Sequence, residues 1–217
     1  MRQEIIDAIK KEQLIVIVRG VSKDKLIPLA EAMYDGGIRL LEVTYSANGA
    51  VSDGQTAENI SALVSHFQNR MYIGAGTVLN EKQVELTKSA GGGFIISPNT
   101  KQSVIEKTRA LDMVSIPGAF SPSEVANAHE LGADFVKLFP VTNFGAEYVK
   151  AIKAPLCHID MLAVGGIDLD NISHYKKAGV CGFGVGSSIT DKAMIANGDW
   201  QGITELAKRY SQAVKGA

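Results

Sequence analysis

Residues 160–186 read DMLAVGGIDLDNISHYKKAGVCGFGVG, a stretch that contains one complete strand–helix–strand unit. The apolar runs Asp160–Val164 and Gly182–Gly186 have the length of buried strands. The segment 168–178 between them has the length and polarity of a helix, and Gly179 follows it as a stop signal. Strands that alternate with helices in this way predict a parallel sheet.

The same alternation extends over the rest of the chain. Eight strands are expected, at Leu14–Arg19, Leu40–Thr44, Met71–Gly74, Phe94–Ser97, Met113–Pro117, Asp134–Phe139, Asp160–Val164 and Gly182–Gly186. The helices expected between them cover 23–35, 56–68, 80–90, 101–111, 121–131, 145–152 and 168–178, with Asn80, Ser121-Pro122 and Asp168 as start signals. Eight such repeats in 217 residues predict an α/β fold, a small (β/α)8 TIM barrel.

An open doubly wound sheet is the alternative to the barrel. Such a sheet favours a Gly-rich phosphate loop after its first strand. Here Arg19-Gly20-Val21-Ser22 stands at that place, without a G-x-G-x-x-G motif, which favours the barrel. Residues 2–12 are expected to form an extra N-terminal helix whose apolar face, with Ile5, Ile6 and Ile9, is suited to cap the barrel bottom.

The composition limits the possible functions. The chain is expected to form a single domain over residues 1–217. Lys plus Arg is 22 and Asp plus Glu is 23, so the net charge is −1, which argues against a general nucleic-acid binder and a polybasic membrane-surface protein. No signal-like segment and no apolar run of the ~20 residues that span a bilayer is seen, so no membrane association and a cytoplasmic location are expected. Cys157 and Cys181 are too few for a disulfide framework and are expected as free thiols.

Three charged residues interrupt the apolar strands. Arg19 ends the first strand, Glu42 lies in the second and Lys137 in the sixth, although barrel strands are buried on both faces. A buried Glu42–Lys137 ion pair that merely fixes the core is one explanation. The other is catalysis: apolar surroundings lower the pKa of a lysine amine, and the neutral amine attacks carbonyls to form a Schiff base, with a carboxylate to shuttle protons.

Other residue types offer less chemistry. His66, His129 and His174 fall on expected helices, His158 precedes a strand, and none has metal-ligand spacing. Ser187 and Ser188 have no neighbouring histidine, so a serine nucleophile is not favoured. We therefore expect neither a catalytic metal nor a cofactor.

The 22 glycines exceed the usual share of ~7%. Some end helices, but two glycine-rich turns follow the last two strands, at Val164–Ile167 and Gly184–Ser188. Loops at these places often bind phosphate in this fold, because glycine lets backbone N–H groups approach the anion. An ordinary tight turn explains either one alone, whereas the two together favour a phosphate site.

Six blocks of the sequence resemble the 2-keto-3-deoxy-6-phosphogluconate / 4-hydroxy-2-oxoglutarate aldolases. They are Glu42-Val43-Thr44, Gly74–Val78, Ser97-Pro98-Asn99, Val136–Pro140, Val164–Ile167 and Gly186-Ser187-Ser188, in the family's order from about residue 14 onward. Further segments are more similar to the 6-phosphogalactonate branch, namely Ile17–Gly20, Ser97–Asn99, Phe144-Gly145 with Tyr148–Ala151, and Ala163–Gly166.

The resemblance implies a class I aldolase, a carbon–carbon lyase that releases pyruvate and glyceraldehyde 3-phosphate from a phosphorylated keto acid, and that also cleaves 4-hydroxy-2-oxoglutarate in some members. It implies that Lys137 forms the Schiff base, that Glu42 is the general acid and base, and that a homotrimer forms. It further implies that Thr77 holds the pyruvyl carboxylate and that a pocket and a phosphate site surround the substrate. The pocket residues would be Pro98, Phe139 and Val164, and the phosphate ligands Gly165, Gly166, Gly186, Ser187 and Ser188.

Three departures from the family pattern matter. The gluconate branch has a carboxylate-binding Arg after its EVT block, where this chain has Tyr45-Ser46, and we expect Arg19 to take that role. Val164 replaces a Thr of that branch, which is expected to alter the preference between the C4 epimers. The loop Ser46–Gln55 looks long for the family; it either covers the site, engages a neighbouring subunit or is a tolerated insertion.

Two rival functions remain at this point. A phosphosugar epimerase or isomerase on the same fold would keep the glycine turns but would not need Lys137. A non-catalytic phosphosugar-binding barrel would also keep the turns, but it gives no reason for Glu42 and Lys137 to lie inside apolar strands.

Overall fold

The computed structural model describes residues 1–216, in which strands and helices alternate along the chain. The strands are β1 (Leu14–Val18), β2 (Leu40–Thr44), β3 (Tyr72–Gly76), β4 (Phe94–Ile96), β5 (Val114–Ile116), β6 (Gly118–Ala119), β7 (Val136–Leu138), β8 (Met161–Val164) and β9 (Gly182–Val185). The helices are α1 (Arg2–Glu12), α2 (Lys23–Asp35), α3 (Asp53–Phe67), α4 (Glu81–Ser89), α5 (Gln102–Ala110), α6 (Pro122–Glu130), α7 (Gly145–Lys153), α8 (Ile172–Lys177), α9 (Lys192–Asn197) and α10 (Trp200–Gly216).

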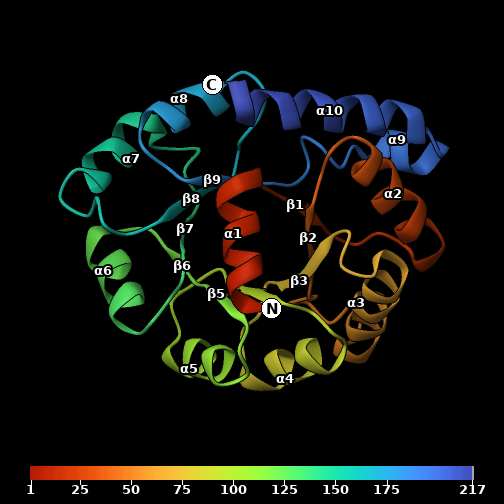
Figure 1. Cartoon of the computed structure of the whole chain (residues 1–217), viewed down its shortest axis with the longest axis horizontal. Helices are drawn as coiled ribbons and strands as arrows, with labels where there is room; N and C mark the ends of the chain where they lie inside the picture. Colours follow the sequence, from red (N-terminus) through yellow and green to blue (C-terminus); the bar gives the residue numbers. More distant parts are fainter. Residues whose placement is uncertain (217) are drawn as a thin grey trace.

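The strands form one parallel sheet that curves into a barrel, with the helices as an outer ring (Figure 1). The strand order is β5-β4-β3-β2-β1-β9-β8-β7-β6, so the first strand pairs with both β2 and the last strand. Pro117 alone separates β5 from β6, and the chain itself thus links the two ends of the sheet. The predicted TIM barrel is confirmed, and the open doubly wound sheet is wrong. The fifth expected strand, Met113–Pro117, ends at Ile116 because proline has no N–H for the ladder, and the short strand β6 that follows Pro117 was not expected.

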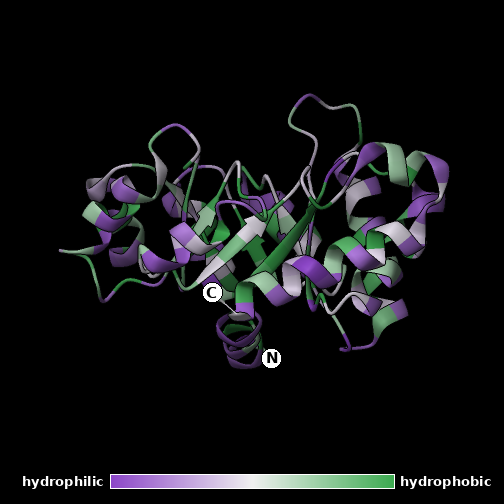
Figure 2. Ribbon diagram, turned by 90° about the horizontal axis from the view of Figure 1, so that it is seen from above, coloured by the Kyte–Doolittle hydropathy of each residue, from purple (hydrophilic) through white to green (hydrophobic). Residues whose placement is uncertain are grey.

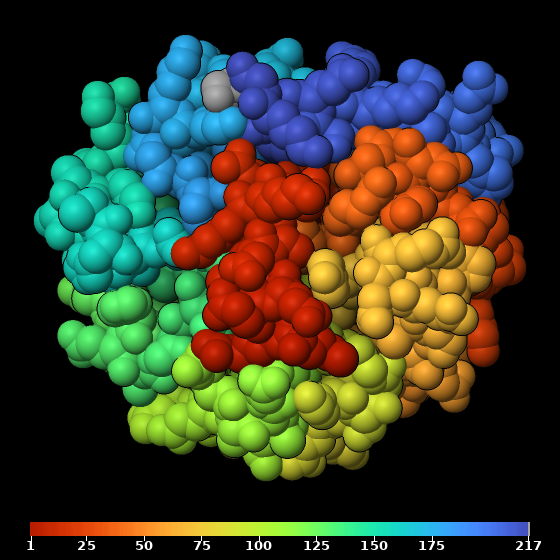
Figure 3. Space-filling model, viewed as in Figure 1, coloured from red at the N-terminus to blue at the C-terminus, as the bar shows by residue number. Residues whose placement is uncertain are grey.

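Side chains alternate between two apolar layers. Ile15, Phe94 and Leu162 point into the barrel, whereas neighbours such as Leu14 and Val16 pack outward against the helices. Helix α1 lies across one end of the barrel (Figures 1 and 3) and projects below the strands in the side view (Figure 2). Its Ile5 and Ile9 are fully buried in the inner layer. The expected N-terminal helix is therefore confirmed, and it closes the barrel at the end where the strands begin.

Most helix boundaries lie within one residue of those expected, because the capping residues are in the sequence. Asn80 caps α4 by accepting from the N–H of Gln83, and Ser121 caps α6 in a reciprocal capping box with Glu124. Helix α3 begins at Asp53, three residues early, because Ser52 caps it. Asp168 does not start a helix: α8 begins at Ile172, and the Asp168 carboxylate accepts from the backbone of the preceding turn.

Helices α9 and α10 were not among the expected elements. The buried residues of α10 recur at the helical period, and the helix packs along α2. None of the helices within residues 1–216 is long and apolar enough to cross a membrane.

Candidate active site

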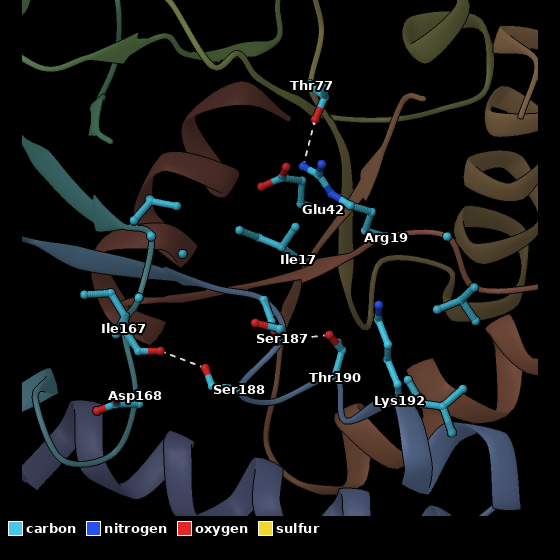
Figure 4. Close-up of a pocket in the computed structure, with 18 of the residues that line it drawn as sticks. Ile17, Arg19, Glu42, Thr77, Ile167, Asp168, Ser187, Ser188, Thr190 and Lys192 are labelled. Atoms are coloured by element: carbon cyan, nitrogen blue, oxygen red, sulfur yellow. Dashed lines mark hydrogen bonds between the residues drawn. The ribbon is translucent and has the colours of Figure 1, made fainter. Parts of the chain in front are cut away.

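A cavity of about 1030 Å³ is lined by residues at the ends of the strands and in the loops that follow them, away from α1. Parallel barrels place their catalytic groups at this end because all the strand–helix loops meet there. Every site residue expected from the sequence lines this one cavity, and Figure 4 labels five of them, Arg19, Glu42, Thr77, Ser187 and Ser188. The full set is Arg19, Glu42, Thr77, Pro98, Lys137, Phe139, Val164, Gly165, Gly166, Gly186, Ser187 and Ser188.

Glu42 and Lys137 project inward from strands on opposite walls of the barrel. Glu42 on β2 is 2% exposed and Lys137 on β7 is 7% exposed. The two side chains have no nitrogen–oxygen contact within 4.0 Å, so a closed ion pair is the wrong explanation for them. The Lys137 Nζ lies 4.7 Å from the centroid of the Phe139 ring, an aromatic wall beside the amine. Both groups thus line the same cavity without touching each other.

The low polarity of the cavity changes the acidity of both groups. Burial lowers the pKa of the Lys137 amine; the Glu42 carboxylate acts against this, and the Arg19 guanidinium lowers the pKa further. Burial also raises the pKa of the Glu42 carboxyl, although the charges of Lys137 and Arg19 partly offset the effect. A neutral amine is a nucleophile, and a carboxyl with a raised pKa holds a proton more readily and can both donate and accept one.

The Glu42 carboxylate packs directly on the backbone of β3. A Cβ added at Gly76 would lie 1.6 Å from Glu42 Oε1, so no other residue fits there while Glu42 keeps its position. Gly76 belongs to the Gly74–Val78 block, which resembles the family but gives no local sign of this contact. Its structural role depends on contact between two strands, which the sequence alone does not reveal.

Arg19 and Thr77 meet at the far wall of the cavity. The Arg19 guanidinium donates a hydrogen bond of 3.2 Å to the Thr77 hydroxyl (Figure 4). Thr77 has a φ of 56°, a left-handed conformation that is unfavourable for a β-branched residue. Such strain is typical of functional sites, where the surrounding structure holds the residue in place. Together the two residues present a guanidinium and a hydroxyl to the same region, which suits a carboxylate.

The turn after β8 lines the cavity and is held in place through its carbonyls. Gly165 and Gly166 have φ values of 95° and 72°, which favour glycine. The Gly165 carbonyl accepts from the Thr142 hydroxyl at 2.8 Å, and the Gly166 carbonyl accepts from the Asn171 amide at 2.7 Å. In a trans peptide the carbonyl of one residue points opposite to the N–H of the next, so these two anchors orient the N–H groups of Gly166 and Ile167 away from Thr142 and Asn171. Sequence reasoning missed Thr142 and Asn171, since their roles depend on the folded loops.

The turn after β9 faces the first one. The Gly186 carbonyl accepts from the amides of Ile189 and Thr190, which closes a single helical turn. Within residues 1–216, the amides of Ser187 and Ser188 donate to no protein acceptor. The Ser188 hydroxyl donates to the Ile167 carbonyl at 2.7 Å and ties the two turns together (Figure 4). Among the described residues, the Ser187 hydroxyl has no hydrogen-bond partner, so Ser187 offers both its hydroxyl and its N–H. The Ser188 hydroxyl is used in the bond to Ile167, so Ser188 offers only its N–H. This cradle of neutral donors suits a phosphate group.

The cavity has further lining residues that sequence reasoning missed, among them Ile17, Lys25, Asp168 and Lys192. Lys192 begins α9, one of the two unexpected helices, so its position relative to the strands could not be inferred. No group of three or more His, Cys, Asp and Glu residues in the described part of the chain could hold a metal ion.

The long loop after β2 does not line this cavity. Its residues from Ser46 to Val51 instead form one wall of a second cavity of about 440 Å³, which adjoins the first at Arg19. The last residues of the expected loop, 53–55, belong to α3. The loop therefore does not cover the first cavity, which was one of the three explanations for its length.

Comparison with known proteins identifies the family. The family model for KDPG and KHG aldolases matches residues 5–206. The chain belongs to the KDPG and KHG aldolase family. It is 32% identical to the 2-dehydro-3-deoxy-6-phosphogalactonate aldolase of Escherichia coli, over 94% of this chain and 98% of that protein. It is 31% identical to the KHG/KDPG aldolase of the same organism, over 94% and 90% of the two chains.

Solved structures agree with this assignment. A native KDPGal structure superposes with a TM-score of 0.81 at 32% identity, over 93% of this chain and 96% of that one. KDPG aldolase from Legionella pneumophila superposes with a TM-score of 0.82 at 29% identity, over 94% and 96% of the chains. That structure holds pyruvate as a covalent carbinolamine intermediate. The family, its class I aldolase chemistry and the lyase class expected from the sequence are confirmed, and the epimerase and non-catalytic alternatives are not supported.

Proposed function

We propose that Lys137 is the Schiff-base residue and Glu42 the proton-transfer residue of this aldolase. The observation that carries the proposal is the placement of Lys137: a buried amine with a lowered pKa that faces a carboxyl group across the cavity. A neutral amine is required to attack a carbonyl carbon, and the burial of Lys137 favours that form.

Lys137 and Glu42 together can carry out the cleavage of a 2-keto acid through a Schiff base. The Lys137 Nζ attacks the C2 carbonyl of the keto acid, and Glu42 donates a proton to the departing hydroxyl, so that water leaves and a protonated imine forms. Glu42 then takes the proton of the C4 hydroxyl, directly or through a water molecule. The C3–C4 bond breaks, its electron pair moves into the imine to give an enamine, and the aldehyde leaves. Protonation at C3 and hydrolysis release pyruvate and restore the Lys137 amine.

The two ends of the cavity fit the two ends of such a substrate. Arg19 and Thr77 take the carboxylate, as expected from the sequence, with Pro98 and Phe139 beside the reacting carbons. The turns at Gly165-Gly166 and Gly186–Ser188 take a phosphate. The substrate is accordingly a 2-keto-3-deoxy-6-phospho sugar acid, with glyceraldehyde 3-phosphate as the second product.

Two finer points of specificity belong to the same proposal. Val164 is 5% exposed and lines the cavity without a hydroxyl, so we expect the galactonate epimer to be cleaved at least as well as the gluconate epimer. Kinetics on both epimers test this, and strict selectivity for the gluconate epimer would contradict it. Cleavage of 4-hydroxy-2-oxoglutarate to pyruvate and glyoxylate is measured in the same assay.

The decisive experiment is reductive trapping with pyruvate and borohydride, followed by peptide mapping. We expect one pyruvyl adduct, on Lys137, and none on Lys192, which lines the same cavity and serves as an internal control. The Lys137→Met variant should form no adduct and lose the aldolase reaction. An unmodified wild-type chain, or an adduct that persists in Lys137→Met, would overturn the assignment.

The quaternary state and location are proposals of the same kind. The family resemblance implies a homotrimer that acts in the cytoplasm, without nucleic-acid or membrane partners. Light scattering on the purified protein should give the mass of three chains, and a single-chain mass at micromolar concentration would refute the trimer.

A further inference from the structure

Lys192 lies at the start of α9, and its side chain points into the cavity (Figure 4). Within residues 1–216, its ammonium group forms no hydrogen bond to a protein acceptor and no ion pair with a carboxylate within 4.0 Å. The residue is exposed, so the long side chain has room to move toward a ligand. The Lys192 ammonium group is therefore available to bind an anionic ligand in the cavity.

The other cations of the cavity already have contacts or roles. Lys25 donates to the Ala196 carbonyl at 2.9 Å, and this bond joins α2 to α9. Arg19 is bonded to Thr77, at the carboxylate end. Lys137 must be uncharged to react. Among the basic residues of the cavity lining, Lys192 is thus the one without a protein partner or a proposed role in the reaction.

The phosphate cradle itself carries no positive charge. It offers amides of glycine and serine and the Ser187 hydroxyl, all of them neutral donors. The Asp168 carboxylate lines the same end of the cavity, although one of its oxygens accepts from the amides of Asp170 and Asn171. A phosphate group with nearly two negative charges would face this carboxylate with no opposing cation from the cradle.

We infer that Lys192 provides the counter-charge for the substrate phosphate and so determines the preference for phosphorylated over unphosphorylated keto acids. The inference rests on the proposed function. On binding, the Lys192 side chain approaches a phosphate held by the two turns, and its ammonium offsets the repulsion from Asp168. Lys192 follows the Gly186–Thr190 turn closely in the chain and has no contact with Lys137 or Glu42, so it should affect binding of the phosphorylated substrate and leave the chemistry at Lys137 unchanged.

The test compares Lys192→Met with Lys192→Arg and with a control, Lys150→Met. Lys150 is an exposed lysine on α7 that does not line the cavity. For the phosphorylated substrate we expect Lys192→Met to lower kcat/KM about tenfold, mainly through KM, as for the loss of one charge-assisted contact. Lys192→Arg should retain most of the activity, and Lys150→Met all of it.

Two further measurements separate this inference from the proposed function. The rate of pyruvate trapping on Lys137 should be equal in wild type and Lys192→Met, since pyruvate has no phosphate. Inorganic phosphate should inhibit the wild type competitively and inhibit Lys192→Met about tenfold more weakly. Equal phosphate inhibition, or equal KM values for the phosphorylated substrate, would overturn the role of Lys192 while trapping still succeeds. Failure of trapping in the wild type would instead overturn the proposed function, and direct binding of inorganic phosphate would then decide on Lys192 independently.

Discussion

At the residue scale, the cavity combines two buried ionisable groups whose charges depend on each other. Glu42 and Lys137 do not touch, yet the pKa of each responds to the charge of the other and to Arg19. A closed ion pair would keep the amine protonated and unreactive. The separation between the groups keeps the amine available, and the guanidinium nearby disfavours the ammonium form.

This arrangement predicts opposite effects of two substitutions on Lys137. Arg19→Met removes a positive charge that lowers the pKa of the amine, so this pKa should rise. Glu42→Gln removes a negative charge that raises it, so the pKa should fall further below 10.5. The pH dependence of Lys137 modification by fluorodinitrobenzene, a reagent without a carboxylate, measures both. Shifts in the same direction would show that the charges of Arg19 and Glu42 do not control the amine.

Gly76 is predicted to control the position of the proton-transfer group. In Gly76→Ala the new Cβ would overlap Glu42 Oε1, so the carboxylate must move by more than an ångström. Displacement of a catalytic group on this scale reduces kcat by on the order of 100-fold. Gly54→Ala is the matched control, because its Cβ would meet only the Ser52 hydroxyl, at 4.0 Å. Normal kcat in a folded Gly76→Ala protein, verified by circular dichroism, would refute this requirement.

Sequence reasoning found the site residues whose chemistry conflicts with their surroundings. A charge inside an apolar strand, as at Glu42 or Lys137, is visible without a structure. The residues that it missed act through contacts between distant segments. The Thr142 hydroxyl donates a hydrogen bond to the Gly165 carbonyl in the turn after β8, and the Asn171 amide donates one to the Gly166 carbonyl in the same turn. Nothing in their local sequence distinguishes them from ordinary loop residues.

At the element scale, the sequence predicted the barrel because each strand and most helices carry their own signals. Helix α10 was missed although Ile203, Ala207, Tyr210 and Val214 recur at helical spacing. Gly202 near its start weakens the local helix signal, and packing along α2 stabilises the helix. The early start of α3 has a similar cause, since Asp53-Gly54-Gln55 has no apolar residue to extend the periodic pattern.

Helix α1 is predicted to stabilise the barrel without taking part in catalysis. Ile9 is fully buried against the inner layer at the end opposite the cavity. Ile9→Ala should lower the free energy of unfolding by about 2–5 kcal/mol, through lost burial and the cavity left behind. Lys11→Ala, an exposed change on the same helix, should alter it by less than ~0.5 kcal/mol. Urea unfolding measures both free energies. A changed rate of pyruvate trapping in folded Ile9→Ala protein would contradict the claim that α1 stabilises the barrel without affecting the active site at the opposite end.

At the scale of the whole molecule, the net charge of −1 conceals an uneven distribution. The cavity lining contains more cations than anions, although its proposed substrate carries both a carboxylate and a phosphate. The cations are Arg19, Lys25 and Lys192, apart from the reactive Lys137 amine, and the carboxyl groups are those of Glu42 and Asp168. A cavity with low-polarity walls concentrates such a local field, so an anionic substrate is attracted to one end of a nearly neutral protein.

This distribution predicts that salt weakens the reaction of the phosphorylated substrate more than that of pyruvate. Raising the ionic strength from 0.1 M to 1 M shortens the screening length from ~10 Å to ~3 Å. We expect kcat/KM for the phosphorylated acid to fall about three- to tenfold, because this substrate carries more charge than pyruvate, whose trapping rate should change less. Chloride and acetate salts should give the same result, which separates screening from occupation of the phosphate cradle by a particular anion. The dependence on salt should be weaker in Lys192→Met, and a salt-independent kcat/KM in the wild type would show that the local charges do not attract the substrate.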